Sequence, residues 1–250
     1  MKVTYIYHSG FLVETDPAVF LFDYYKGELP AFPAEKPLIV FASHKHPDHF
    51  DFKIFDLQTH PGGVTYVFGN DIKLNENYLQ RHGVNPAVRE KIHRMPSHTE
   101  LTLPLKAGTG DKPESVTIHT LKSTDAGAAF YVKAGDVRIY HGGDLNWWHW
   151  EGESKAFNRQ QECVYKEEIN YLKKLLEGNA ELDAAFVPLD PRLKDAYCLG
   201  MDYFLSHIPV KEVFPMHMWD DYDVIKRYLS HCKEREDTGQ FAKCIKNPLE

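Results

Sequence analysis

The feature of this 250-residue sequence that most constrains its fold is a cluster of histidines directly after a short apolar run. Residues 38–41 read Leu-Ile-Val-Phe, a continuous apolar run that predicts a strand buried on both faces. Residues 43–50 follow at once and read Ser-His-Lys-His-Pro-Asp-His-Phe. His44 and His46 are two positions apart, so an extended segment projects both imidazoles to the same side. We therefore expect a buried strand whose end carries several metal-binding side chains.

The two positions after Pro47 extend this cluster. Because proline bends the chain, Asp48 and His49 can face a second point close to the first two histidines. Imidazole and carboxylate groups are suitable ligands for divalent ions of borderline hardness. A structural zinc site usually recruits cysteine and closes all four coordination positions, whereas a hydrolytic site keeps one position open for water. The cluster therefore predicts a hydrolytic metal centre at the end of a strand.

The composition narrows the class of protein. Lys and Arg total 29 against 36 Asp and Glu, which gives a net charge of -7 and argues against a general nucleic-acid binder. The sequence holds no run of about 18 apolar residues, so we expect no membrane span. The alternating residues 3–7 fit a strand rather than a signal peptide, and four widely spaced cysteines fit reduced thiols. We expect a cytoplasmic protein that binds a small-molecule substrate, in an oligomeric state that the sequence does not define.

Strand patterns dominate the first part of the chain, and helical patterns join them in the latter part. The length fits one domain, which we assign to residues 1–248, with residues 249–250 as a cloning scar. We expect strands at residues 3–7, 11–14, 18–23, 38–41, 64–68, 116–121, 128–132, 137–140, 184–189 and 213–215, and helices at 71–80, along 165–176 and from Asp220 or Asp221 to Cys232. Strands followed by helices in each half predict an α/β fold in which two sheets pack together with helices outside.

The histidine motif resembles that of the metallo-β-lactamase fold hydrolases, and three further segments extend the resemblance along the chain. Residues 8–11, His-Ser-Gly-Phe, are similar to the N-terminal hairpin of that family. Residues 141–144, His-Gly-Gly-Asp, resemble the segment whose aspartate bridges two metals, and residues 215–217, Pro-Met-His, resemble the segment with the last histidine ligand. The resemblance implies an αββα sandwich of two mixed sheets flanked by helices, with the metal site at one edge. Residues 123–127 look most similar to stand-alone hydrolases near the ascorbate-phosphate lactonase and N-acyl-phosphatidylethanolamine phospholipase D branches.

The same resemblance implies one or two divalent ions, Zn²⁺ or Mn²⁺, and a role for each motif residue. The implied ligands are His44 and His46 for the first ion, Asp48, His49 and His217 for the second, and Asp144 between the two. A bridging carboxylate such as Asp144 lowers the repulsion between two adjacent cations. Asp48 is also the implied catalytic residue, because it would orient the attacking hydroxide. His8 and His141 are implied as supporting residues behind the ligands, with His141 orienting a ligand carboxylate.

The sequence departs from the family pattern at the first metal. Most relatives carry a further histidine ligand before the bridging aspartate, but residues 120–125, Thr-Leu-Lys-Ser-Thr-Asp, contain none. Asp125 can replace the imidazole as an oxygen ligand, which would favour a harder ion such as Mn²⁺. Alternatively, the first site binds its ion weakly, or the ammonium group of Lys122 fills the gap. Of these we prefer Asp125 as the substitute ligand.

Residues that suit an anionic substrate follow a later strand. Asp190 and Arg192 stand in the segment Asp-Pro-Arg, where the guanidinium can act as a fixed fork for a carboxylate or phosphate. A surface ion pair on a loop explains the same residues. Together with Lys122 they are our predicted substrate contacts. The aromatic residues 147–150 either form a wall of the pocket, pack a loop or expose a patch for association.

These observations favour a metal-dependent hydrolase in which a metal-activated water attacks a small anionic ester, lactone or phosphodiester. The alternative is a non-catalytic metal-binding or sensing protein that retains the fold with one metal, which the missing histidine would explain. A nuclease is less favoured, because the chain is acidic and shows no basic appended arm.

Overall fold

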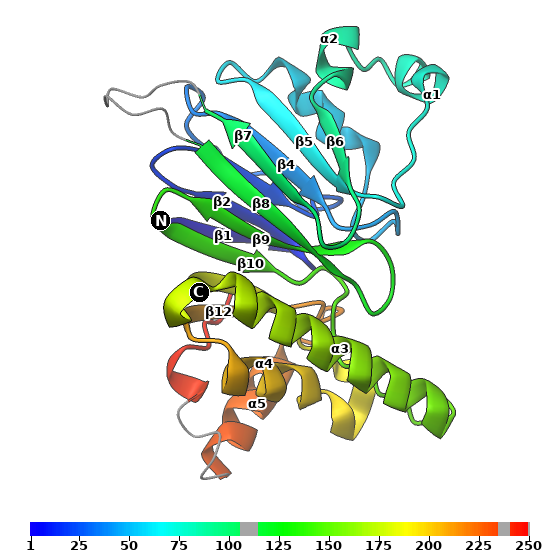
Figure 1. Ribbon diagram of the computed structural model, residues 1–250, viewed down its shortest axis with the longest axis vertical. Helices are drawn as coiled ribbons and strands as arrows, with labels where there is room; N and C mark the ends of the chain where they lie inside the picture. Colours follow the sequence, from blue (N-terminus) through cyan, green and yellow to red (C-terminus); the bar gives the residue numbers. More distant parts are fainter. Residues whose placement is uncertain (106–114, 235–240, 250) are drawn as a thin grey trace.

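The computed structural model describes residues 1–105, 115–234 and 241–249. Within these segments, two six-stranded sheets lie face to face with helices on both outer sides (Figure 1). The first sheet contains, in spatial order, β1 (Lys2–Tyr7), β2 (Gly10–Glu14), β3 (Val19–Phe22), β4 (Leu38–Ala42), β5 (Val64–Gly69) and β6 (Ile92–Met95). The second contains β12 (Val210–Met216), β11 (Leu182–Pro188), β10 (Val137–His141), β9 (Ala128–Ala134), β8 (Ser115–Lys122) and β7 (Glu100–Pro104).

Both sheets are mixed, as predicted. In the first, the pairs from β3 to β6 are parallel, and the two pairs before them are antiparallel. In the second, β10, β11 and β12 are parallel, and the remaining pairs are antiparallel. The carboxyl ends of the parallel strands therefore lie at a common edge in each sheet, where loops that carry functional side chains meet in such folds.

Three buried layers hold the sheets and helices together. Phenylalanines fill the space between the sheets, and the rings of Phe22 and Phe41 stack 4.6 Å apart. The outer face of the first sheet is covered by η1 (Phe52–Thr59), α1 (Glu76–Arg81) and α2 (Pro86–Arg89). The outer face of the second is covered by α3 (Lys155–Leu175), α4 (Leu199–His207) and α5 (Asp223–Glu234). This arrangement confirms the predicted αββα sandwich.

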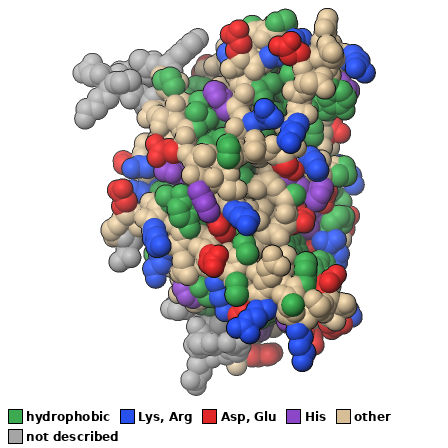
Figure 2. Space-filling model, turned by 45° about the vertical axis from the view of Figure 1, so that its right-hand side comes forward, with side chains coloured by type: hydrophobic (Ala, Val, Ile, Leu, Met, Phe, Trp, Pro, Cys, Tyr) green, Lys and Arg blue, Asp and Glu red, His purple; other side chains and the backbone are tan. Residues whose placement is uncertain are grey.

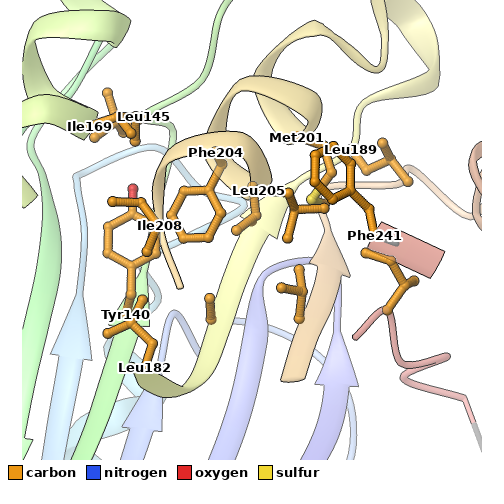
Figure 3. Close-up of a cluster of buried hydrophobic side chains, with 14 of the residues drawn as sticks. Tyr140, Leu145, Ile169, Leu182, Leu189, Met201, Phe204, Leu205, Ile208 and Phe241 are labelled. Carbon is orange, nitrogen blue, oxygen red and sulfur yellow. The ribbon is translucent and has the colours of Figure 1, made fainter. Parts of the chain in front are cut away.

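The layer under α4 shows how an outer helix is held. Figure 3 shows Phe204 of α4 facing Tyr140 of β10, with ring centroids 5.2 Å apart, and Ile208 and Leu182 beside them. These side chains are almost fully buried. Burial of each large apolar side chain contributes about 1.5–3 kcal/mol, so α4 is held to the sheet mainly by this apolar contact.

Several element boundaries differ from the predictions. The helix expected at residues 71–80 is shorter and begins at Glu76, because the side chain of Asn75 accepts a hydrogen bond from the N–H of Tyr78 and caps it there. α3 begins at Lys155, ten residues before the predicted apolar stripe, because Ser154 caps it. β6, β7 and α4 were not predicted; each is short and lacks a long periodic pattern.

No helix in the described residues is long and apolar enough to cross a membrane. On the face shown in Figure 2, basic and acidic side chains are mixed with one another. This mixture fits the net charge of -7.

Candidate metal centre

The predicted ligands come together where the carboxyl ends of strands from both sheets meet. Three of the residues there, His8, Asp23 and His217, directly follow β1, β3 and β12, and all three have left-handed backbone conformations, with φ of 56°, 41° and 63°. A non-glycine residue in this region costs about 1–3 kcal/mol and persists where the surrounding structure enforces it, which is common at functional sites. The backbone at these three strand ends is therefore strained, and the strained conformation directs the side chains of His8, Asp23 and His217 toward the centre.

Two groups of ligand atoms form at this edge. In the first group, His44, His46, Asp125 and Asp144 each offer an atom within 4.8 Å of the others. In the second group, the same holds for His8, Asp48, His49 and His217. Every predicted metal ligand therefore lies in one of the two groups. His8, which we predicted behind the ligands, lies among them: its Nε2 is 3.6 Å from Oδ2 of Asp48, and its ring centroid is 4.2 Å from that of His217.

Asp144 lies between the two groups. Its Oδ2 is 3.3 Å from Nε2 of His44, in the first group. Its Oδ1 is 3.1 Å from Nε2 of His49 and 3.4 Å from Nε2 of His217, in the second. The two carboxylate oxygens thus face different groups, which is the arrangement that a bridging ligand needs.

Three buried atoms at this place form no hydrogen bond among the described residues: Nε2 of His8, Nε2 of His49 and Oδ1 of Asp144. Nε2 of His49 and Oδ1 of Asp144 lie 3.1 Å apart but are not aligned for a hydrogen bond. Buried polar atoms are nearly always paired, and an unpaired one costs about 1–3 kcal/mol. A divalent cation would satisfy all three, since each is a normal ligand atom. The residues present therefore fit a metal ion.

The charges of the centre are strongly coupled. Burial would raise the pKa of Asp144, but His49 and His217 beside it hold that pKa well below its usual range. Burial lowers the pKa of His44 to about 4, and neighbouring His49 acts in the same direction. His44 is thus neutral near pH 7 and has a lone pair available for a metal. Burial also disfavours the charged form of His49, yet Asp144 and Asp23 raise its pKa well above the ordinary value.

Two buried carboxylates hold the histidines from behind. Nδ1 of His49 donates to Oδ2 of Asp23 at 2.7 Å, and Nδ1 of His217 donates to Oδ2 of Asp190 at 2.9 Å. In both cases the opposite nitrogen, Nε2, faces Asp144. Such pairs fix the tautomer and the ring orientation of a ligating histidine. Asp23 was not predicted, because a lone aspartate after a strand carries no local signal.

Asp23 also supports the first group through Ser43. The hydroxyl of Ser43 donates to Oδ2 of Asp23 at 2.7 Å and lies 2.9 Å from Nδ1 of His44. His44 therefore donates from Nδ1 to the hydroxyl and keeps Nε2 for the metal side. One fully buried carboxylate, Asp23, thus orients a histidine in each group.

The predicted substrate contacts lie in different surroundings. Asp190 is fully buried, and its carboxylate is occupied by His217 and Arg192, which does not fit the predicted direct contact with a substrate. Arg192 forks onto Asp190 through Nε and Nη2, and its guanidinium lies 4.4 Å from the ring centroid of Trp219. Lys122 ends β8 with an exposed side chain, and its backbone N–H donates to Glu168.

His141 and the tryptophan segment shape the surroundings of Asp144. His141 is fully buried; its Nε2 donates to the carbonyl of Ser9, and its Nδ1 accepts from the N–H of Gly143. It therefore fixes the turn that presents Asp144. The indole N–H of Trp148 donates to the carbonyl of Asp144, and its ring centroid lies 5.6 Å from that of His217, so Trp148 forms a wall of the centre.

We expect the Asp23→Asn variant to bind Zn²⁺ about 10- to 100-fold more weakly, which is the usual effect of removing a carboxylate behind a ligating histidine. Isothermal titration of the metal-free protein measures this affinity. The matched control is Asp16→Asn, which changes an exposed aspartate in the turn between β2 and β3 that belongs to neither group of ligand atoms. Equal affinities for Asp23→Asn and wild type would contradict the orienting role of Asp23.

Comparison with known proteins identifies the family and the fold. Residues 2–159 match the family model of the beta-lactamase superfamily domain, and no curated protein sequence matches the chain significantly. Among solved structures, the chain is similar to CmlA, a diiron β-hydroxylase from Streptomyces venezuelae, at 11% identity and a TM-score of 0.56, over 94% of this chain but only 51% of CmlA. The chain therefore spans about half the length of that protein.

Two further solved structures are matched along nearly their whole length. Igni18, a metallo hydrolase from the archaeon Ignicoccus hospitalis, is 14% identical with a TM-score of 0.52, over 92% of this chain and 90% of that one. An isothiocyanate hydrolase from Delia radicum gut bacteria is 14% identical with a TM-score of 0.54, over 98% of this chain and 95% of that one. These likenesses support the fold, and the family model covers more than half of the sequence. The chain belongs to the beta-lactamase superfamily and has the metallo-β-lactamase fold.

Proposed function

We propose that this protein is a metal-dependent hydrolase that acts on a small anionic ester, lactone or phosphodiester. The observation that carries the proposal is the position of Asp144, with one carboxylate oxygen toward each of two groups of ligand atoms. Divalent ions held there, Zn²⁺ or Mn²⁺, would supply Lewis-acid polarisation of the substrate and lower the pKa of a water molecule. The first group would hold one ion through His44, His46 and Asp125, and the second group would hold the other.

Asp48 is the residue of the second group that we assign to catalysis. Its side chain is 22% exposed, whereas those of His8 and His49 beside it are almost fully buried, so Asp48 faces the open side of the centre. Burial would raise the pKa of Asp48, but the imidazole of His8, whose Nε2 lies 3.6 Å from Oδ2 of Asp48, and the charge of His49 hold that pKa below the usual range. Asp48 is therefore ionised at neutral pH and can accept a hydrogen bond from the attacking water, which orients that water toward the substrate.

Arg192 is the cation that we assign to the anionic group of the substrate. Its side chain is 44% exposed, and its contacts with Asp190 use Nε and Nη2. Nη1 has no hydrogen-bond partner in the described part of the chain, so it remains to donate to a carboxylate or phosphate oxygen. The rings of Trp150 and Trp219 lie against the guanidinium and hold its plane. Lys122, exposed at the end of β8, is a second candidate for this contact.

The proposal is tested by removing all metal from the purified protein and reloading it with Zn²⁺ or Mn²⁺. The reloaded protein should hydrolyse at least one member of a panel of p-nitrophenyl esters, lactones and bis(p-nitrophenyl) phosphate, and the metal-free protein none. The control is His46→Ala, which removes a ligand of the first group and should lower both metal content and rate. Tight metal binding without turnover of any panel member would contradict the proposal and favour a metal-binding or sensing protein.

For a substrate found in this way, we expect Arg192→Lys to reduce kcat/KM about tenfold for the anionic form and to leave a neutral analogue unchanged. The lysine keeps the charge but loses the planar fork that matches a carboxylate or phosphate. Steady-state kinetics with both substrates measures the difference, and Lys122→Ala tests the second cation in the same assay. Equal losses for the anionic and neutral substrates would show that Arg192 acts only through Asp190.

A further inference from the structure

A third group of metal-binding side chains lies between α4 and α5, apart from the centre at Asp144. Cys198 directly precedes α4, Asp202 follows one turn later, and His231 projects from α5. A thiol sulfur, a carboxylate oxygen and a ring nitrogen from these three residues lie within 4.8 Å of one another. We propose that Cys198, Asp202 and His231 form a structural zinc site that ties α5 to α4.

The spacing of the three atoms is close to that of a tetrahedral site. Zinc bonds of about 2.0–2.3 Å place neighbouring tetrahedral ligands roughly 3.3–3.8 Å apart. Nε2 of His231 and Oδ2 of Asp202 already lie 2.8 Å apart, so side-chain adjustments of about 1 Å complete the geometry. The centre at Asp144 shows the same contraction, since Nε2 of His44 and Nδ1 of His46 lie 2.9 Å apart.

A hydrogen bond fixes the orientation of the Asp202 carboxylate. The hydroxyl of Tyr228, a fully buried residue of α5, donates to Oδ1 of Asp202 at 2.8 Å, while Oδ2 is the oxygen that faces His231. Such a hydrogen bond from behind fixes the direction of a ligating carboxylate. Because Cys198 caps the start of α4, Asp202 lies in α4 and His231 lies in α5, the ion would connect two helices of the outer layer.

The donor set and the exposure of the site indicate zinc. One thiolate, one imidazole and one carboxylate are a mixed set that Zn²⁺ accepts in tetrahedral geometry. Cys198 is buried, but the side chains of Asp202 and His231 are 17% and 22% exposed, so an ion can enter and a water molecule can complete its coordination. Binding releases the proton of the thiol to solvent.

The site would act on stability and not on the reaction. α5 begins six residues after His217, so a tie between α5 and α4 also holds the element that follows the last ligand of the centre at Asp144. None of the four cysteines, all in described segments, forms a disulfide. Cys232, next to His231 on α5, is fully buried and is not part of the three-residue group. It offers a matched control.

Cobalt substitution tests the proposal, because a thiolate bound to Co²⁺ gives a charge-transfer band in the near ultraviolet. The two groups at Asp144 contain no cysteine, so the band would report this site alone. We expect the band in the Co²⁺-loaded wild-type protein, in Cys232→Ser and in His46→Ala, and its loss in Cys198→Ser and His231→Ala. Zinc content should fall by one equivalent per chain in Cys198→Ser, with the hydrolysis rate unchanged within about twofold.

Absence of the band in the cobalt-loaded wild type would overturn the proposal, whatever the variants do. A band that persists in Cys198→Ser, or that vanishes in Cys232→Ser, would also overturn it, since the sulfur ligand would then be a different residue. If Cys198→Ser does not fold, as judged by circular dichroism, zinc content is measured in Asp202→Asn instead, which removes the charge of a ligand but keeps the size of the side chain and the contact with Tyr228. Its zinc content should fall by one equivalent per chain, and an unchanged content would overturn the proposal. The cobalt band and the zinc content do not depend on hydrolysis, so failure of the proposed function leaves both interpretable.

Discussion

We expect the Asp144→Asn variant to hydrolyse substrate about a thousandfold more slowly than the wild-type protein, or slower still, and to bind fewer divalent ions. The carboxylate of Asp144, a member of the first group, faces His44 with one oxygen and His49 and His217 of the second group with the other, so it is placed to bridge the two groups. An amide carries no charge and offers one acceptor atom in place of two. Both groups should therefore lose metal affinity at once. Elemental analysis and steady-state kinetics measure the two effects.

The matched control for Asp144→Asn is Asp136→Asn, which changes an exposed turn aspartate between β9 and β10 of the same sheet. It should leave metal content and rate unchanged. If Asp144→Asn retained two ions at the centre and at least a tenth of the wild-type rate, Asp144 would not be the bridge between the groups.

The second large effect concerns Gly127, which packs against Ser43 and His44 just after β4. We expect Gly127→Ala to lower the free energy of unfolding by about 3 kcal/mol or more. Its φ is +65°, and an added Cβ would lie 2.0 Å from the carbonyl oxygen of Ser43 and 2.5 Å from Cβ of His44. A backbone atom cannot move aside as the end of a flexible side chain can, so the segment with Ser43 and His44 must shift. Because His44 is a candidate ligand, we expect the metal affinity to fall together with the stability. Urea unfolding of the metal-free protein measures the first effect and metal titration the second.

Gly135 is the control that separates crowding from conformation. Its φ is +60°, almost the same as that of Gly127, but nothing lies within 4 Å of an added Cβ. Gly135→Ala should therefore cost only the conformational strain, about 1 kcal/mol, and leave metal affinity intact. Similar decreases in the free energy of unfolding for the two variants would mean that the contact with Ser43 and His44 does not contribute to the effect of Gly127→Ala.

The clustering of the candidate ligands that lie close together in sequence could be predicted, because their geometry is local. His44, His46, Asp48 and His49 follow a strand whose apolar run is plain in the sequence, and the structure brings all four to the predicted edge. The two-sheet fold could be predicted from the strand patterns and the family resemblance together. Asp125, the residue that we preferred in place of the missing histidine, lies in the first group, with Oδ2 at 3.7 Å from Nδ1 of His46.

Contacts that depend on strand pairing could not be predicted. Asp23 reaches His49 because β3 pairs with β4 in parallel, with Phe22 opposite Phe41, and this register places Asp23 beside Ser43. No periodicity in residues 18–23 carries that information. The register of β11 against β12 has the same consequence for Asp190, which sequence patterns place in an open loop and the fold buries behind His217.

The position of His8 depends on still more distant parts of the chain. Its turn between β1 and β2 is predicted from the sequence, but its place among the ligands is set by the end of β12, more than 200 residues later. The N–H of His217 donates to the carbonyl of His8, which brings the two rings together. Sequence patterns therefore give no sign that His8 lies beside His217.

Anomalous scattering from a crystal grown with Zn²⁺ tests the central claim of two adjacent ions most directly. The difference map at the zinc absorption edge should show two peaks at Asp144, one next to Oδ2 among the first group and one next to Oδ1 among the second. A single peak there, two peaks that both lie away from Asp144, or no peak at all would contradict the two-metal centre.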